Sequence, residues 1–171
     1  MRLIMIQLKD LPDEKILKKF TDRYAEADAV SVIQFLNILR IGSDLSDALD
    51  NFLSKRGLLQ GRWWVLILLM REETLTSTPS DLATKAGVSR ATMTGLIDGL
   101  VRENLVDRLM DEIDRRKYSI KLTASGQSKL DELMPDYYQR VKLLMSTIPV
   151  NQREILLSQL IKLKEKSNIF D

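Results

Sequence analysis

Residues 114–126 read Asp-Arg-Arg-Lys-Tyr-Ser-Ile-Lys-Leu-Thr-Ala-Ser-Gly. Three cations precede a run in which Tyr118, Ile120 and Leu122 alternate with polar residues. Such alternation is typical of a strand with one buried face. Thr123 is a residue type that commonly caps a helix. The stretch therefore predicts a charged β-hairpin whose second strand, 118–122, leads directly into a helix.

A pair of short helices is predicted just before this hairpin. Thr78 and Pro79 suit a helix start, because threonine can cap the first turn and proline fits its first position. Gly87 suits the end of that helix, and Ser89 can cap the next. Helices over 78–87 and 89–103, joined by a tight glycine turn, form a helix–turn–helix pattern. A strand over 105–110 would complete the hairpin.

The second helix of the pair has an apolar stripe and a polar start. The stripe consists of Met93, Leu96, Ile97, Leu100 and Val101. The start of such a helix is where side chains reach base edges in the major groove of DNA. Another interpretation is a solvated helix start in any small helical domain. The DNA-binding candidates off the stripe are Ser89, Arg90, Thr92 and Thr94.

The predicted hairpin tip mixes acids with its cations, so it is not a simple basic patch. We expect Asp114 to orient a neighbouring arginine by a charge-assisted hydrogen bond. An arginine on a projecting hairpin fits a narrow minor groove, where the negative potential is enhanced. The alternatives are a solvated mixed-charge turn and a cation site. The acids fit no metal-binding loop, so we expect no metal. The wing candidates are Asp114, Arg115, Arg116 and Lys117.

Composition narrows the function classes. The chain has 171 residues and a net charge of +2, so binding to a polyanion must depend on local clusters of cations. It lacks cysteine and histidine, which excludes disulfides, thiol redox switching and the commonest general base. We therefore expect neither an enzyme nor a cofactor. The N-terminus resembles no signal peptide, and no apolar run reaches the length of a bilayer span. We expect a cytoplasmic protein with no membrane partner.

The rest of the chain is predicted to be helical. Pro12 and Asp13 suit the start of a first helix, a second covers about 30–53, and a third covers 63–70. Pro135 should kink or break the long helix after Thr123 and is a candidate hinge. Residues 151–154 resemble a capping box that begins a last helix. The fold class is thus mainly α with a small β-hairpin.

Residues 75–126 resemble the MarR family of winged-helix transcription regulators. The matching residues, in order, are Leu82, Ala83, Val88, Ser89, Thr94, Asp98, Leu100, Leu105, Val106, Arg108, Asp114, Arg115, Arg116, Leu122, Thr123 and Gly126. The resemblance implies a winged helix–turn–helix over 57–126 and a helical dimerisation region over 12–56 and 127–171. It also implies a ligand-responsive repressor, or an activator, that binds a pseudo-palindromic DNA operator as a homodimer. The family's wing motif makes Arg116 the expected minor-groove arginine.

Two glycines depart from the family pattern. Gly95 and Gly99 stand where many members carry arginine, so we expect a less basic recognition helix and a shallower salt dependence of DNA binding. Asn104 replaces a common glycine at the end of that helix. Asparagine tolerates the left-handed conformation, so this change should be harmless.

Trp63 and Trp64 have two interpretations. They could form the floor of a pocket for a small aromatic effector, as family members often bind such molecules. The favoured alternative is that one packs in the core and the other lies at a helix junction.

The terminal helices carry more apolar surface than a lone chain would bury, which predicts a two-fold dimer. The dimerisation candidates are Phe20, Tyr24, Tyr137, Val141, Leu157, Leu160 and Ile161. The competing function is a winged-helix module that binds protein rather than DNA.

Overall fold

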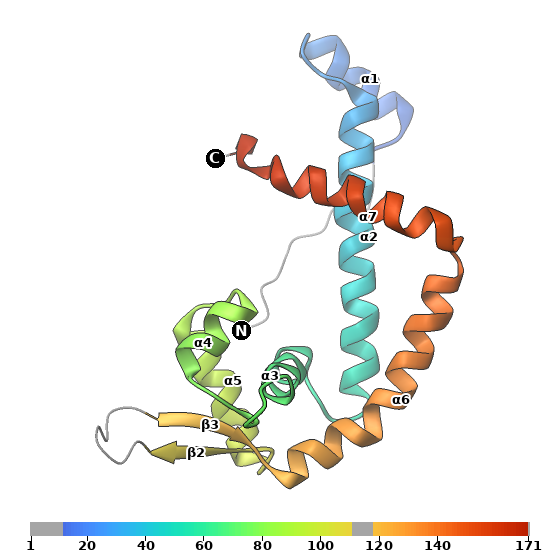
Figure 1. The fold of residues 1–171 in the computed structure, drawn as a ribbon. Coiled ribbons are helices and arrows are strands. Elements are labelled where there is room, and N and C mark those ends of the chain that lie inside the picture. The colour runs from blue at the N-terminus through green and yellow to red at the C-terminus, as the bar shows by residue number, and fades with distance from the viewer. Residues whose placement is uncertain (1–11, 111–117, 171) are drawn as a thin grey trace. The chain divides into compact units, whose positions relative to one another are not determined.

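The computed structural model describes residues 12–110 and 118–170. It is mainly helical with a small β-sheet, which confirms the predicted fold class (Figure 1). The elements are α1 (Glu14–Arg23), α2 (Ala29–Ser54), α3 (Gln60–Met70), β1 (Thr76–Ser77), α4 (Pro79–Ala86), α5 (Arg90–Arg102), β2 (Val106–Met110), β3 (Tyr118–Leu122), α6 (Ala124–Ser146), α7 (Val150–Glu165) and a 3₁₀ helix, η1 (Ser167–Phe170). The chain divides into two compact units, Met1–Gly126 and Gln127–Asp171. The assignment of dimerisation to residues 12–56 and 127–171, and of DNA binding to residues 57–126, stays a prediction.

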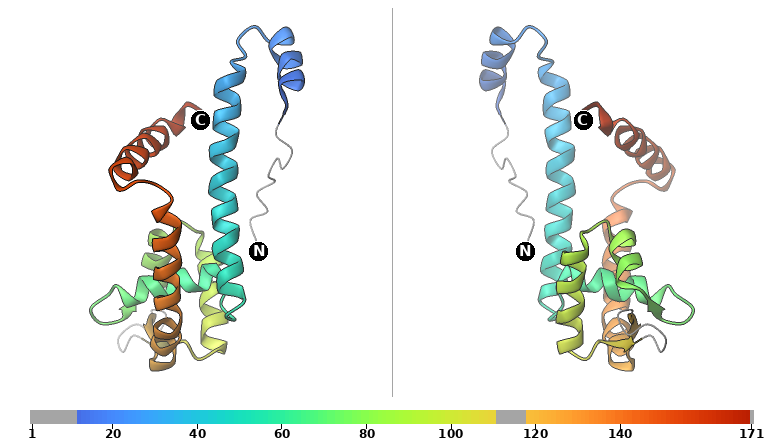
Figure 2. Two further views of the ribbon diagram at one scale, coloured as in Figure 1. Left: turned by 90° about the vertical axis from the view of Figure 1, so that its right-hand side faces the viewer. Right: turned by 90° about the vertical axis from the view of Figure 1, so that its left-hand side faces the viewer.

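The first three helices form where the sequence predicts them. The Asp13 side chain caps α1 by accepting a hydrogen bond from the Ile16 N–H at 2.8 Å. α1 turns back beside the N-terminal end of α2, which continues without a break through Gly42 (Figure 2). α3 is mostly buried, as its apolar run predicts. Its buried residues are Trp63, Val65, Leu66, Leu68 and Leu69.

The sheet has three antiparallel strands in the order β1–β3–β2. β2 and β3 form the predicted hairpin, with Val106 opposite Leu122 and Met110 opposite Tyr118. β1 was not predicted, because two residues are too few to show an alternating pattern. It pairs with β3 through Thr76 and Ser77. The wing is therefore anchored on both sides of its second strand.

Two residues other than glycine have a positive φ in the described part of the chain. Asn104, the second residue after α5, has φ 55°, which confirms the expected tolerance of asparagine there. Leu75 also has φ 55°, which costs a branched residue about 1–2 kcal/mol. Two backbone hydrogen bonds hold Leu75 in this left-handed conformation. The Leu75 N–H donates to the Glu72 carbonyl, and its own carbonyl accepts from the Leu122 N–H, each at 2.9 Å. Leu75 thus turns the chain into β1.

α6 begins as predicted but does not end at its proline. The Thr123 hydroxyl accepts a hydrogen bond from the Gly126 N–H at 2.9 Å and so caps the helix. The helix then continues through Pro135, so of the two predicted outcomes, a kink or a break, the break does not occur. Proline cannot donate to the carbonyl of Asp131, four residues earlier. Both residues are exposed, so water can satisfy that carbonyl and the helix survives.

The start of α7 also differs from the prediction. The helix begins at Val150, with Pro149 in the capping position and no capping side chain among the described residues. The predicted capping box at Asn151 is therefore wrong, because Asn151 already lies inside the helix. The fixed φ of proline suits entry into a helix without a side-chain cap.

No helix within the described ranges combines the length and the apolar character needed to cross a membrane. α2 has 26 residues, but it carries charged residues such as Arg40, Asp44 and Asp50.

Gly126 provides a test of the close packing between the start of α6 and the sheet. A Cβ at this position would collide with the Leu105 carbonyl oxygen and lie 2.7 Å from Leu122 Cδ1. A backbone oxygen cannot move aside cheaply, so Gly126→Ala should destabilise the protein by roughly 1–3 kcal/mol in urea unfolding.

Gly42→Ala is the matched control, because no described atom lies within 4 Å of a Cβ there. It should raise stability by roughly 0.5–1 kcal/mol, the usual gain from replacing a helical glycine. If Gly126→Ala proves as stable as Gly42→Ala, the close approach is wrong.

Candidate nucleic-acid interface

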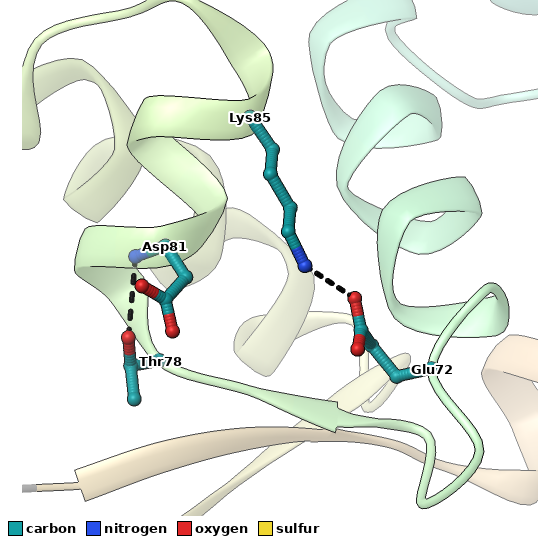
Figure 3. A network of polar contacts seen from close by, with 4 residues as sticks. All are labelled: Glu72, Thr78, Asp81 and Lys85. Carbon is teal, nitrogen blue, oxygen red and sulfur yellow. Dashed lines mark hydrogen bonds and ion pairs between the residues drawn. The ribbon is translucent and has the colours of Figure 1, made fainter.

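α4 is fixed at both ends by the local interactions that its sequence predicts. The Thr78 hydroxyl accepts from the Asp81 N–H at 3.2 Å, so Thr78 is the N-cap (Figure 3). Gly87 follows the helix with φ 65°, which confirms the predicted glycine turn. Lys85 pairs with Glu72, with 2.5 Å between Nζ and Oε1, and so ties α4 to the turn after α3 (Figure 3). These contacts set where α5 can begin.

α5 has one buried and one exposed side. Met93, Ile97 and Leu100 are completely buried, as their spacing predicts. Burial of each such side chain stabilises the fold by roughly 1.5–3 kcal/mol, so the helix has a strong preference for one orientation. The four candidates that the sequence singles out are all exposed on the first turns: Ser89, Arg90, Thr92 and Thr94.

The hydroxyl candidates already have local partners. The Ser89 oxygen accepts from the Thr92 N–H at 3.1 Å, which makes Ser89 the N-cap of α5, and it lies 2.9 Å from the Thr92 hydroxyl. The Thr94 hydroxyl donates to the Arg90 carbonyl at 3.0 Å. Their first role is thus to shape the helix start, although each oxygen retains capacity for a further hydrogen bond.

Arg90 differs from these three. Within residues 12–110 and 118–170, its exposed guanidinium takes part in no hydrogen bond or ion pair. A guanidinium has five N–H donors, which can bind a base edge or a phosphate. Of the four candidates, Arg90 therefore has the most hydrogen-bonding capacity to offer to DNA.

The base of the wing is attached to α5 by an ion pair. Arg108 of β2 donates to Asp98 of α5, and its guanidinium lies 5.3 Å from the ring centre of Tyr118 on β3. Helix and hairpin thus form one surface. The tip candidates Asp114, Arg115, Arg116 and Lys117 lie outside the described residues, as do Asp111 and Glu112. Their assignment stays a prediction.

A contact between α3 and α5 was not predicted. Gly99 is buried, and a Cβ there would lie 2.5 Å from Cζ of Arg62. The Arg62 guanidinium also forms an ion pair with Glu103, directly after α5. A glycine inside a helix was the available signal, because it costs about 1 kcal/mol relative to alanine and so suggests that close packing requires it. This contact changes the interpretation of Gly99. Many family members have an arginine at this position, whereas here the guanidinium of Arg62 on α3 fills the space beside the glycine. Gly95 is exposed, with no described atom within 4 Å of a Cβ.

The two tryptophans have different environments. Trp63 is 1% exposed and belongs to the core, whereas Trp64 is 44% exposed. Their ring centres are 4.5 Å apart. This arrangement fits the core interpretation, and the effector pocket stays a prediction. A shallow hollow of about 550 Å³ lies elsewhere, between α1 and α2, and neither tryptophan lines it. Its lining residues are Leu17, Lys18, Thr21, Ala29, Val30, Ile33 and Gln34.

The dimerisation candidates are largely uncovered in the single chain. In α7, which lies wholly within the described part of the chain, no residue is buried. The exposed candidates are Phe20, Tyr24, Val141, Leu157, Leu160 and Ile161, and Tyr137 is half-buried.

Comparison with known proteins shows which families and structures this chain resembles. Residues 58–118 match the model of the MarR family. The chain is 30% identical over 165 residues to the HTH-type transcriptional repressor YetL of Bacillus subtilis, covering 96% of this chain and 99% of that protein.

Solved structures share the fold. AbsC, a MarR family transcriptional regulator from Streptomyces coelicolor, aligns with a TM-score of 0.74 and 23% identity over 81% of this chain and 95% of AbsC. Sco3205 of the same organism, solved in complex with DNA, aligns with a TM-score of 0.74 and 18% identity over 82% of this chain and 88% of Sco3205.

The Ser89 cap gives a stability prediction for the start of α5. Ser89→Ala removes the acceptor for the Thr92 N–H and should cost roughly 0.5–2 kcal/mol in thermal or urea unfolding. Ser89→Asp should retain wild-type stability, because aspartate caps a helix as well as serine does. Equal stability of the alanine variant and the wild-type protein would show that the cap contributes nothing.

Proposed function

Because this chain belongs to the MarR family of DNA-binding transcriptional regulators, we propose that it is a repressor that binds a pseudo-palindromic operator as a homodimer. One observation carries the proposal: Arg90 stands exposed at the start of a helix whose other side is buried. YetL is named a repressor and Sco3205 was solved with DNA, which supports the same function here. A protein that binds chromosomal DNA acts in the compartment that holds it, so we infer a cytoplasmic location.

The proposed complex places α5 in a major groove and the wing in the adjoining minor groove. Two-fold symmetry would repeat the contact on half-sites roughly 34–36 Å apart, one turn of the double helix. Arg90 would donate to a base edge, and Ser89, Thr92 and Thr94 would reach bases or phosphates. Arg116, with Arg115 and Lys117, would enter the minor groove with Asp114 as its orienting partner.

The dimer is supported by the apolar surface of the terminal helices. In α7, Leu156, Leu157, Leu160 and Ile161 are all at least 39% exposed although their spacing places them on one helix face. An apolar face of this kind is stable when another surface covers it. A second copy of the chain would supply that surface in a symmetric interface.

The proposal includes regulation by a small aromatic molecule. The exposed ring of Trp64 offers a surface on which such a molecule could stack. The molecule would change DNA affinity only if it bound more tightly to one spacing of the two recognition helices than to another.

Arg90→Ala tests the DNA contact directly. With a palindromic duplex from the DNA beside the protein's own gene, a fluorescence titration should show a loss of about 1–3 kcal/mol in binding free energy. Discrimination should relax at the contacted base pair. Lys162→Ala on α7 removes the same charge from an exposed site and should have little effect.

The proposal fails if the wild-type protein does not bind this duplex at low salt, or if the two variants bind alike. Binding of a protein partner that survives loss of the wing cations would favour the competing interaction module.

Leu157→Glu tests the dimer. A charge on the exposed apolar face of α7 should shift the protein to a monomer in analytical ultracentrifugation, because a buried carboxylate is costly to desolvate. Lys162→Glu places a carboxylate on α7 about 100° or more around the helix from each of Leu156, Leu157, Leu160 and Ile161, and should leave the mass unchanged. A wild-type protein that is monomeric at micromolar concentration would contradict the dimer.

A further inference from the structure

We propose that Arg62 is a positioning residue for the DNA-binding surface, and that it acts by fixing the orientation of α5 through Gly99 and Glu103. The inference rests on the proposed function, because orientation of α5 matters only if α5 reads DNA. Arg62 lies on α3 and belongs to none of the predicted DNA contacts.

One guanidinium contacts α5 at two points. It lies against the backbone at Gly99, where a Cβ would be 2.5 Å from Arg62 Nε. It also forms an ion pair with Glu103, four residues later and on the same side of the helix. The two contacts together define a line along the C-terminal turns of α5.

The neighbouring residue of α3 extends the same line. A Cβ at Gly61 would lie 3.0 Å from Leu96 Cδ2, so α3 approaches α5 closely here as well. Leu96 precedes Gly99 by three residues and is therefore its neighbour on the helix surface. The two helices thus fit a leucine against one glycine and an arginine against the other.

The buried residues of α5 decide which side faces the core, and this fit adds a restraint on smaller rotations of the helix about its own axis. Each residue of an α-helix is turned by about 100° from the last, so rotation would bring a side chain under the guanidinium in place of Gly99. The Arg62 side chain is 19% exposed and that of Glu103 is 41% exposed, so the cation is largely desolvated. A desolvated cation needs its partner, and a separation from Glu103 is therefore unfavourable.

The restraint acts at one end of the helix, and DNA would be read at the other. Arg90 lies nine residues before Gly99, about 14 Å along the axis. A rotated or tilted α5 would move the Arg90 guanidinium away from its base edge while leaving the cation available to phosphates. Loss of Arg62 should therefore weaken sequence discrimination more than general attraction to DNA.

The experiment measures the ratio of two affinities. The probes are a duplex enriched by the wild-type protein from a randomised library and an unrelated duplex of equal length and composition. Arg62→Ala should lower the affinity for the enriched duplex about tenfold and leave that for the unrelated duplex within about twofold. Gly99→Ala should act in the same direction, because its Cβ displaces the guanidinium.

The double variant Arg62→Ala/Gly99→Ala separates a shared contact from two independent ones. If the arginine and the glycine act through the same contact, adding Gly99→Ala to Arg62→Ala should cause no further loss of discrimination. Losses that multiply would overturn the proposed fit. Thermal unfolding of the same four proteins, without DNA, reports the coupling independently.

Glu103→Gln and Glu72→Gln form a matched pair. Each removes one acid from an ion pair, with Arg62 or with Lys85 respectively, and so changes the net charge equally. Only Glu103→Gln should lower discrimination. It also carries the test if Arg62→Ala does not fold, because it leaves the packing of α3 intact.

Unchanged discrimination in the folded variants would overturn the proposal, and so would an equal loss of affinity for both duplexes. In either case the wild-type enrichment would still stand, so the proposed function would survive. If the wild-type protein enriches no duplex, the proposed function fails and this inference fails with it.

Discussion

The burial of Met93, Ile97 and Leu100 on one side of α5 is the constraint on which the candidate interface depends. Three side chains fully removed from water contribute more stabilisation than any single polar contact of the helix. They decide which residues of α5 face solvent, and Arg90 is exposed as a consequence. The N-cap at Ser89 then fixes where the helix begins, so the exposed turn starts at a defined residue.

Several of the cations in this region serve the protein itself. Arg62 is paired with Glu103, Lys85 with Glu72 and Arg108 with Asp98. Each pair neutralises one cation, so fewer positive charges are available to a polyanion here than the number of lysines and arginines suggests. The pairs of Lys85 and Arg108 are partly exposed and contribute little to stability. The Arg62 side chain is more deeply buried, so its separation from Glu103 is more costly. A basic sequence alone would not reveal which cations stay available to a polyanion.

Sequence patterns predicted the elements whose causes are local. The caps at Thr78, Ser89 and Thr123 lie within three residues of their partners, and the strands of the wing show their alternation over five residues. Features with distant causes were missed. β1 has only two residues and exists because β3 pairs with it, and Arg62 meets Gly99 only after the chain has folded.

The structure departs from the sequence predictions at two prolines, where no local side-chain signal decides the outcome. Pro135 leaves a carbonyl that water can satisfy, and α7 begins at a proline without a capping side chain. For the candidate site, the exposed positions on α5 followed from periodicity alone. Periodicity could not show which of these side chains already has a hydrogen-bond partner, because that depends on contacts between neighbouring residues.

The fit of Arg62 against Gly99 has a consequence for how the sequence can change over time. A side chain gained at residue 99 conflicts with an arginine at residue 62, and loss of that arginine leaves a space that a larger residue at 99 can fill. A substitution at residue 62 or residue 99 is therefore tolerated best when the other residue changes as well. In descendants of this chain, substitutions at 62 and 99 should arise as compensating pairs, although nothing in the linear sequence joins them.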